Sequence, residues 1–333
     1  MIKINIQQGD SLELIKNLPS CSVDLIIADP PYNLGKDYGE SNDSFSYEEY
    51  IKFSEYWLSE AHRILKPTGT IYVFMGVRFI SSLYQILECS LKMVFNSWIC
   101  WHYTQGMGKR RGFSPRHDDI LMFTKSDTFT FNLDAIRIPQ KFYRSVNNMR
   151  GANPGDVWEF SHVHYCNKNR KSHPTQKPEG LIERMILASS NENDLVFDPF
   201  SGSGTTLRVC KQLKRNCLGY ELNNEYVNII LDRIEEPFNS FDSIDPRMKR
   251  IPNDLNEIEI RNEYIRNHVE WFLKYHQTDI AEFWKDIELK YGSKQQYNGK
   301  KKGPKPVHEK LKIITETDLQ ISAANKANQL TLL

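Results

Sequence analysis

Four consecutive residues, a carboxylate, two prolines and a tyrosine, are the first candidates for a chemical role in this sequence. Asp29, Pro30, Pro31 and Tyr32 come directly after the apolar run VDLII, which is typical of a strand buried on both faces. The prolines lack N–H groups and force an extended backbone, so they end the strand and stiffen the following loop. We therefore expect Asp29 and an exposed Tyr32 at the carboxyl end of a strand, where open α/β sheets bind ligands.

A glycine-rich turn forms a second candidate site. The stretch LVFDPFSGSGTT is typical of a strand, a tight turn and a helix start, and Gly202 and Gly204 allow the backbone to approach a ligand closely. The next predicted strand, CLGYE, ends in Glu221, about twenty residues beyond the turn, where a carboxylate can bind ribose hydroxyls of a nucleoside cofactor. The third glycine of the dinucleotide fingerprint is missing, which argues against a nicotinamide dehydrogenase.

Strands and helices alternate around these motifs, which predicts an α/β fold with a mostly parallel sheet and helices on both faces. Ser46 and Glu49 form a capping box that begins a long amphipathic helix, and this helix is expected to end at residues 66–69. Asn223 or Asn224 is expected to cap the last helix of the pattern. The predicted strands cover residues 2–6, 23–28, 70–76, 93–103, 118–125, 195–200 and 217–222, and the other helices cover residues 9–19, 79–91, 177–190, 205–213 and 224–234.

Composition and charge narrow the class of protein. With 333 residues, 40% of them hydrophobic and 26% charged, the chain is expected to be soluble, globular and cytoplasmic, without a membrane span. Its six cysteines are scattered without a C-x-x-C pair, so neither a disulfide framework nor a zinc site is expected. Residues 105–177 hold 13 Lys and Arg against 6 Asp and Glu, although the whole chain has a net charge of only +1. This asymmetry favours a polyanionic partner such as nucleic acid.

Together, DPPY, FDPFSGSGTT and YE resemble the motifs of the DNA amino-methyltransferases that use S-adenosylmethionine. The catalytic motif precedes the cofactor motif, an order that resembles the β class, and the resemblance covers roughly residues 3–235. It implies a circularly permuted Rossmann-like methyltransferase fold in which HPTQKP, residues 173–178, closes over the methionine part of the cofactor. The residues implied to bind S-adenosylmethionine are Asp10, Ser11, Asp29, His173, Thr175, Gln176, Lys177, Pro178, Asp198, Pro199, Phe200, Gly202, Ser203, Gly204, Thr205, Glu221 and Leu222.

The resemblance also implies methyl transfer to an exocyclic amino group, with Asp29, Pro30, Pro31 and Tyr32 as the catalytic residues. Asp29 and the Pro30 carbonyl can accept hydrogen bonds from that amino group, and Tyr32 can stack on a base that has left the duplex. Asp29 favours adenine N6, because a Ser at this position usually signals cytosine N4 in the family. The alternatives are a cytosine-N4 enzyme, an RNA or protein methyltransferase, and a binding module that has lost catalysis.

Basic and amide side chains are the candidates for contacting DNA. A short loop, GKRRGFSPRHDD, is predicted to bind phosphates, and a later irregular segment supplies residue types that read base edges; a solvated loop is the alternative for the first. His162, His164 and Cys166 lack a clear fourth ligand, so no metal is expected. The candidate DNA contacts are Lys109, Arg110, Arg111, Arg116, Lys141, Arg144, Asn147, Asn148 and Arg150.

Composition also suggests domain boundaries and partners. Residues 1–236 are predicted to form the catalytic domain, with a target recognition region at 126–172, and residues 237–253 a linker. Residues 254–333 are predicted to form a helical and basic extension whose role is open among DNA contact, dimerisation and partner binding. The polar loop at 33–45 is either a lid or a plain exposed loop. The expected partners are DNA, a second copy of the chain and a restriction endonuclease that acts on the same site.

Overall fold

The computed structural model describes residues 2–35, 44–104, 106, 108–138, 151–163, 171, 173, 175–238 and 250–251. The chain divides into two compact units. One comprises Met1–Ile136 with Pro154–Ile244, and the other comprises Arg137–Asn153 with Asp245–Leu333. In the second unit Ile138 and Ala152 form an antiparallel bridge. The predicted boundaries of the recognition region and of the extension stay predictions, because much of both lies outside the described residues.

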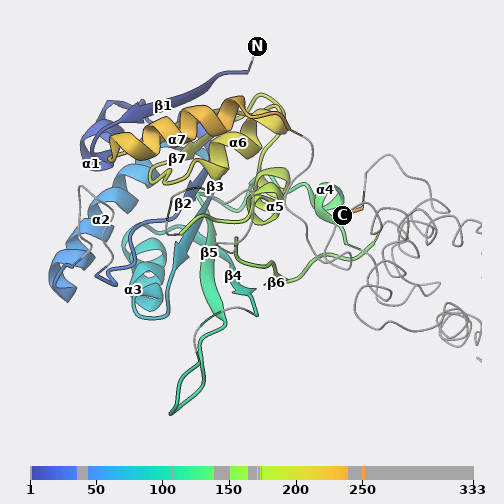
Figure 1. Cartoon of the computed structure of the whole chain (residues 1–333). Coiled ribbons are helices and arrows are strands. Elements are labelled where there is room, and N and C mark those ends of the chain that lie inside the picture. The colour runs from blue at the N-terminus through green and yellow to red at the C-terminus, as the bar shows by residue number, and fades with distance from the viewer. Residues whose placement is uncertain are drawn as a thin grey trace, which may run out of the picture. The chain divides into compact units, whose positions relative to one another are not determined.

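The first unit is built on an eight-stranded sheet with the order β1-β8-β7-β2-β3-β5-β4-β6 (Figure 1). Strand β5 runs antiparallel to its neighbours β3 and β4, and every other pair in the sheet is parallel, as the sequence predicted. The strands are β1 (Ile4–Gln8), β2 (Val23–Ala28), β3 (Leu65–Met75), β4 (Val94–His102), β5 (His117–Thr124), β6 (Val157–Glu159), β7 (Leu195–Asp198) and β8 (Asn216–Glu221).

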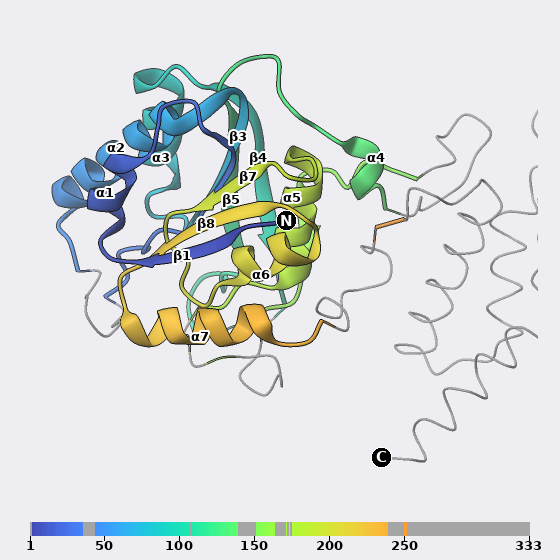
Figure 2. The same ribbon diagram turned by 90° about the horizontal axis from the view of Figure 1, so that it is seen from above.

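Helices cover both faces of this sheet (Figure 2). In β2, Ile26 and Ala28 belong to the core beneath α1, α2 and α3, whereas Leu25 and Ile27 belong to the core beneath α5, α6 and α7. The apolar run therefore is buried on both faces, as predicted. The helices are α1 (Ser11–Leu14), α2 (Tyr47–Ile64), α3 (Ile80–Gln85), α4 (Leu133–Ile136), α5 (Glu179–Ser189), α6 (Thr205–Gln212) and α7 (Asn224–Glu235), with short turns at Ile15–Asn17 and Ile86–Ser90.

Helix α2 begins as predicted but ends earlier. The Ser46 side chain accepts from the Glu49 N–H, and the Glu49 side chain accepts from the Ser46 N–H, so the predicted capping box is confirmed. The helix ends at Ile64, not at residues 66–69, and Leu65 already pairs with Val23 as the first residue of β3. Pro67 is the physical reason, because a residue before proline is pushed away from the helical region.

Other elements also differ from the sequence pattern. The predicted helix at 79–91 is α3 followed by one π turn, Ile86–Ser90. Helix α4 and strand β6 lie in a stretch that shows no clear periodicity, and β6 extends the sheet by pairing in parallel with β4. Asn223 caps α7 by accepting from the Glu225 N–H. In the described part of the chain, no helix is both long and apolar enough to cross a bilayer.

Candidate active site and cofactor pocket

One cavity of about 510 Å³ lies where the two motifs meet. Strands β2 and β7 are parallel neighbours, so the loops that follow their carboxyl ends come together although the chain separates them widely. The volume falls within the range of pockets that hold a small molecule or cofactor. The predicted site residues that line it are Asp10, Ser11, Asp29, Pro30, Pro31, Tyr32, His173, Thr175, Lys177, Asp198, Pro199, Phe200, Gly202, Ser203, Thr205, Glu221 and Leu222.

Three residues predicted to bind the cofactor lie outside the lining of this cavity. Gln176 is buried, and its Oε1 accepts from the Lys171 N–H, so it holds the backbone of its own segment. Pro178 and Gly204 are the N-cap residues of α5 and α6. The lining also includes aromatic residues that the motifs did not reveal, among them Phe53 from α2, Phe74 from β3 and Tyr226 from α7.

Asp29 is bonded at one oxygen and free at the other. Lys177 donates from Nζ to Asp29 Oδ2 over 2.6 Å, and the ammonium lies 5.3 Å from the centre of the Tyr32 ring and 5.1 Å from that of Phe74. Asp29 Oδ1 is buried and accepts no hydrogen bond from the described residues. A buried carboxylate oxygen without a donor is costly, so this atom is available to a ligand in the cavity.

The loop after β2 is fixed by its neighbours. Tyr50 on α2 donates from its hydroxyl to the Pro31 carbonyl over 2.7 Å. Asn33 bonds Phe45 twice, through Nδ2 to the carbonyl and through Oδ1 to the N–H, and so joins the two ends of the segment between them. Tyr32 is half-buried and not exposed as expected, because its ring packs between the two hydrophobic cores.

Backbone N–H groups donate to both carboxylate oxygens of Glu221, which lines the same cavity. Oε2 accepts from the Gly202 N–H over 2.8 Å, and Oε1 accepts from the Asn223 N–H over 2.9 Å. A carboxylate oxygen can accept more than one hydrogen bond, so Glu221 also suits a ligand hydroxyl. The His173 ring covers Gly202 so closely that a Cβ there would lie 2.9 Å from it. Asp10 caps α1 by accepting from the Leu12 N–H over 2.8 Å.

Asp198 is a carboxyl group of the cavity whose pKa is strongly shifted. It is buried at the end of β7 and accepts from the Phe200 N–H over 3.0 Å. Burial raises its pKa to about 7, and hydrogen bonds from Thr206 and Phe200 oppose this shift in part. The Asp198 carboxyl group therefore gains or loses its proton near neutral pH, directly before the glycine-rich turn.

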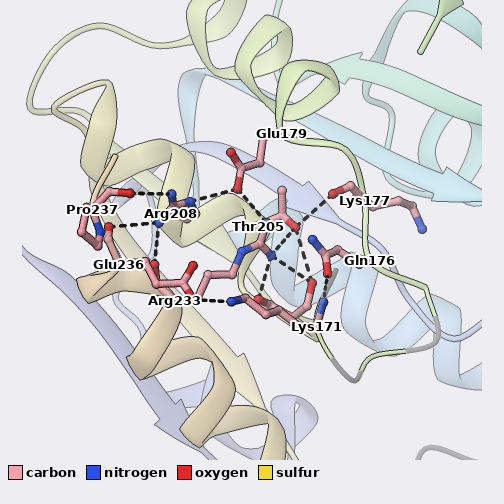
Figure 3. Close-up of polar contacts among 10 residues, drawn as sticks. Lys171, Gln176, Lys177, Glu179, Thr205, Arg208, Arg233, Glu236 and Pro237 are labelled. Carbon is pink, nitrogen blue, oxygen red and sulfur yellow. Dashed lines mark hydrogen bonds and ion pairs between the residues drawn. The ribbon is translucent and has the colours of Figure 1, made fainter. Parts of the chain in front are cut away.

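Two buried arginines, Arg208 and Arg233, form a polar network that contacts the glycine-rich turn (Figure 3). Arg233 on α7 donates from Nη1 to the Ser203 carbonyl over 3.0 Å and to Thr205 Oγ1 over 2.9 Å, and from Nη2 to Glu179 Oε1 over 2.8 Å. Glu179 also pairs with Arg208 over 2.9 Å. Thr205 Oγ1 donates to the Lys177 carbonyl, which links the turn to the lysine that holds Asp29. The sequence analysis did not predict this network, whose charged members lie on α5, α6 and α7.

The predicted DNA contacts fall into two groups. Lys109, Arg110 and Arg111 are exposed on the loop between β4 and β5, whereas Arg116 is half-buried at its base and donates to the Pro115 carbonyl. The predicted contacts at Lys141, Arg144, Asn147, Asn148 and Arg150 lie outside the described residues, as do His164 and Cys166. His162 packs against the rings of Trp101 and Tyr103.

Known proteins are similar to this chain in sequence and in architecture. The family described as DNA methylase matches residues 23–232. The chain is 62% identical over 287 residues to Type II methyltransferase M.HpaI of Haemophilus parainfluenzae, which covers 86% of this chain and 91% of that protein. It is 36% identical over 245 residues to DNA adenine methyltransferase YhdJ of Escherichia coli strain K12, or 69% of this chain and 82% of that protein. The solved M1.HpyAVI–SAM complex is similar with a TM-score of 0.52 at 28% identity, over 71% of this chain and 100% of that chain.

Proposed function

Because the chain belongs to the DNA methylase family, we propose that its cavity transfers a methyl group from S-adenosylmethionine directly to N6 of adenine in DNA. The chain is an S-adenosylmethionine-dependent DNA methyltransferase of the β class. Direct transfer needs no nucleophilic side chain, and the described residues that line the cavity include no cysteine.

The cavity fits the cofactor by its hydrogen-bond acceptors and by its glycine-rich turn. Carboxylates at Glu221 and Asp10 suit hydroxyl groups, and the Gly202 turn allows a ligand to approach the backbone. When bound, S-adenosylmethionine supplies an electrophilic methyl group on a sulfonium. We assign the binding of the cofactor to Asp10, Glu221, His173 and the Asp198–Thr205 loop. We assign to Lys177 the orientation of Asp29.

Asp29 would prepare the acceptor nitrogen. The lone pair of an adenine amino group is conjugated with the ring and is a poor nucleophile. Asp29 Oδ1 and the Pro30 carbonyl would each accept an amino hydrogen, which draws the nitrogen toward tetrahedral geometry and aims its lone pair at the methyl group. Placement of this kind can lower the activation barrier by about 5 kcal/mol. Tyr32 would stack on the extruded base.

The free Oδ1 of Asp29, in the same cavity as the cofactor loop, carries this proposal. The test is mass spectrometry of nucleosides from DNA treated with the protein and S-adenosylmethionine bearing a deuterated methyl group. Wild-type protein should produce labelled N6-methyladenine, and Asp29→Ala should produce none while still binding the cofactor. Labelled N4-methylcytosine would overturn the adenine assignment, and no labelled base in any DNA would overturn the DNA substrate.

The partners beyond DNA belong to the same proposal. We infer a cytoplasmic modification enzyme that protects DNA from a restriction endonuclease acting on the same site, supported by the similarity to a relative named as a type II methyltransferase. Treated DNA should then resist that endonuclease. We also propose a homodimer, as expected from the β class. Light scattering should give a mass of two chains, and a single-chain mass with full activity would contradict it.

A further inference from the structure

The loop between β4 and β5 leaves the sheet on the side of the active site. Strands β2 and β3 are parallel, and β5 is antiparallel to both β3 and β4. Strand β4 therefore points the same way as β2, and residues 103–116 begin at the edge where Asp29 lies. Figure 1 shows this hairpin projecting from the sheet between β4 and β5.

The tip of this hairpin combines an exposed aromatic ring with three cations. Phe113 is 99% exposed, more than any other large hydrophobic side chain in the described residues. Lys109, Arg110 and Arg111 are also exposed, and no ion pair that involves them occurs in the part of the chain described. An isolated exposed apolar residue is ordinary, but an uncovered phenyl ring among free cations is suited to a polyanion with apolar surfaces between its charges.

The tip is held in shape by its own hydrogen bonds. Ser114 Oγ accepts from the Lys109 N–H over 2.8 Å, which closes the tip, and the Tyr103 N–H donates to the Arg116 carbonyl over 2.9 Å, which closes the base. Gly112 has a φ of +85°, a conformation that a residue with a side chain rarely adopts. Below the base, the ring centre of Tyr103 lies 5.4 Å from that of the buried Trp101. These contacts hold the loop that carries Phe113 to the end of the sheet.

We propose that Phe113 is a wedge that inserts between stacked bases of the DNA substrate while Lys109, Arg110 and Arg111 bind the flanking phosphates. Extrusion of a base for reaction at Asp29 requires unstacking, and apolar side chains that enter the stack lower this cost. The loop and the active site share one edge of the sheet, so one bound duplex can reach both. This inference rests on the proposed DNA methylation.

The test compares Phe113→Ala with wild type in single-turnover methylation of two duplexes, one fully paired and one with the target adenine mismatched. A mismatched base is already weakly stacked, so the variant should lose about tenfold on the paired duplex and less than about twofold on the mismatched one. Equal losses on both duplexes, or no loss on either, would overturn the wedge. Its thermal unfolding should match wild type, because the side chain is exposed.

The matched control is the double variant Arg110→Ala/Arg111→Ala. This variant should weaken binding to all DNA and make the slope of log affinity against log salt shallower by about 1.8. Unlike Phe113→Ala, it should lose as much activity on the mismatched duplex as on the paired one. A readout that needs no methyl transfer separates the wedge from the proposed function: unwinding of relaxed plasmid by the protein with S-adenosylhomocysteine, scored after topoisomerase treatment. Wild type should unwind the plasmid and Phe113→Ala should not. Equal unwinding by both would overturn the wedge even if the wild type methylated no adenine.

Discussion

Lys177 and Asp29 form an ion pair of 2.6 Å inside the cavity, although 148 residues separate them in the chain. The ammonium lies 5.3 Å from the ring centre of Tyr32 and 5.1 Å from that of Phe74. Because Lys177 occupies Oδ2, Asp29 offers its Oδ1, which no described residue bonds, to the amino group of the base in the proposed reaction.

Replacing Lys177 by Met should slow methyl transfer more than it weakens cofactor binding. Asp29 then loses the donor that fixes its orientation, and misplacement of a reacting group can cost on the order of 10²-fold in rate. Single-turnover methylation and equilibrium binding of S-adenosylmethionine measure the two effects. Lys177→Arg should recover part of the rate, and the surface variant Lys214→Met should behave as wild type. Comparable losses of rate and cofactor affinity would instead assign Lys177 to the cofactor.

Arg233→Met should destabilise the fold. Arg233 is 2% exposed and bonds Glu179, Ser203 and Thr205. We expect a loss of about 3 kcal/mol in the free energy of unfolding, the lower end for breaking a buried pair, because Arg208 still pairs with Glu179. Urea unfolding measures it. Lys214→Met removes an exposed pair with Glu192 and should change stability by less than about 0.5 kcal/mol.

The double variant Glu179→Gln/Arg233→Met adds a second test of the same network. If the two side chains act on each other, the double variant should lose less stability than the two single variants predict together, because either change alone breaks the pair. Additive losses would mean that Arg233 acts only through Ser203 and Thr205.

Gly204→Ala should distort the cofactor turn. Gly204 has a φ of +75°, and a Cβ would lie 2.8 Å from Ile230 Cγ1. Strain of this kind costs about 1–3 kcal/mol, and we expect weaker S-adenosylmethionine binding in calorimetry. The control is Gly108→Ala, because Gly108 is exposed and a Cβ there would meet no atom within 4 Å. Combined with Ile230→Ala, which removes both Cγ atoms, Gly204→Ala should weaken binding less than it does in the wild-type background. An equal loss in both backgrounds would assign the effect to φ alone.

Asp198 should make stability depend on pH. Its pKa is raised from 3.8 to about 7 by burial, so between these values the folded state keeps a proton that the unfolded state has lost. The stabilisation from this group is therefore fully present below about pH 4 and is lost as pH rises through about 7. Urea midpoints of wild type should fall from about pH 5 to about pH 8 more steeply than those of Asp198→Asn. Parallel curves would contradict the raised pKa.

The features predicted correctly from sequence depend on near neighbours in the chain. The capping box joins Ser46 to Glu49, and the buried run before Asp29 is a strand because β-branched and apolar residues follow one another there. The two motifs could be assigned to one site because strands of a parallel sheet end at the same edge.

The features that sequence reasoning missed depend on distant partners. Nothing near Lys177 indicates Asp29, and nothing near Arg233 indicates Glu179. Phe53 lies on the apolar side of a helix like any core residue, but its contacts with Phe45 and Phe200, distant in the chain from one another, bring it to the cavity. Strand β6 has three residues and forms because β4 offers an open edge, which its own sequence does not predict.

The central pairing of the sheet also bears on how the chain folds during synthesis. The Leu195 N–H donates to Asp24, 171 residues earlier, and Lys3 bonds Asn216 across 213 residues. Strand β3 follows β2 early in the chain, but at about 5–20 residues per second the ribosome needs on the order of ten to thirty seconds to supply β7, the other neighbour of β2. During that interval one edge of β2 has no strand to pair with, and exposed strand edges aggregate. Chaperone capture of nascent chains should therefore end only after β7 and β8 have emerged.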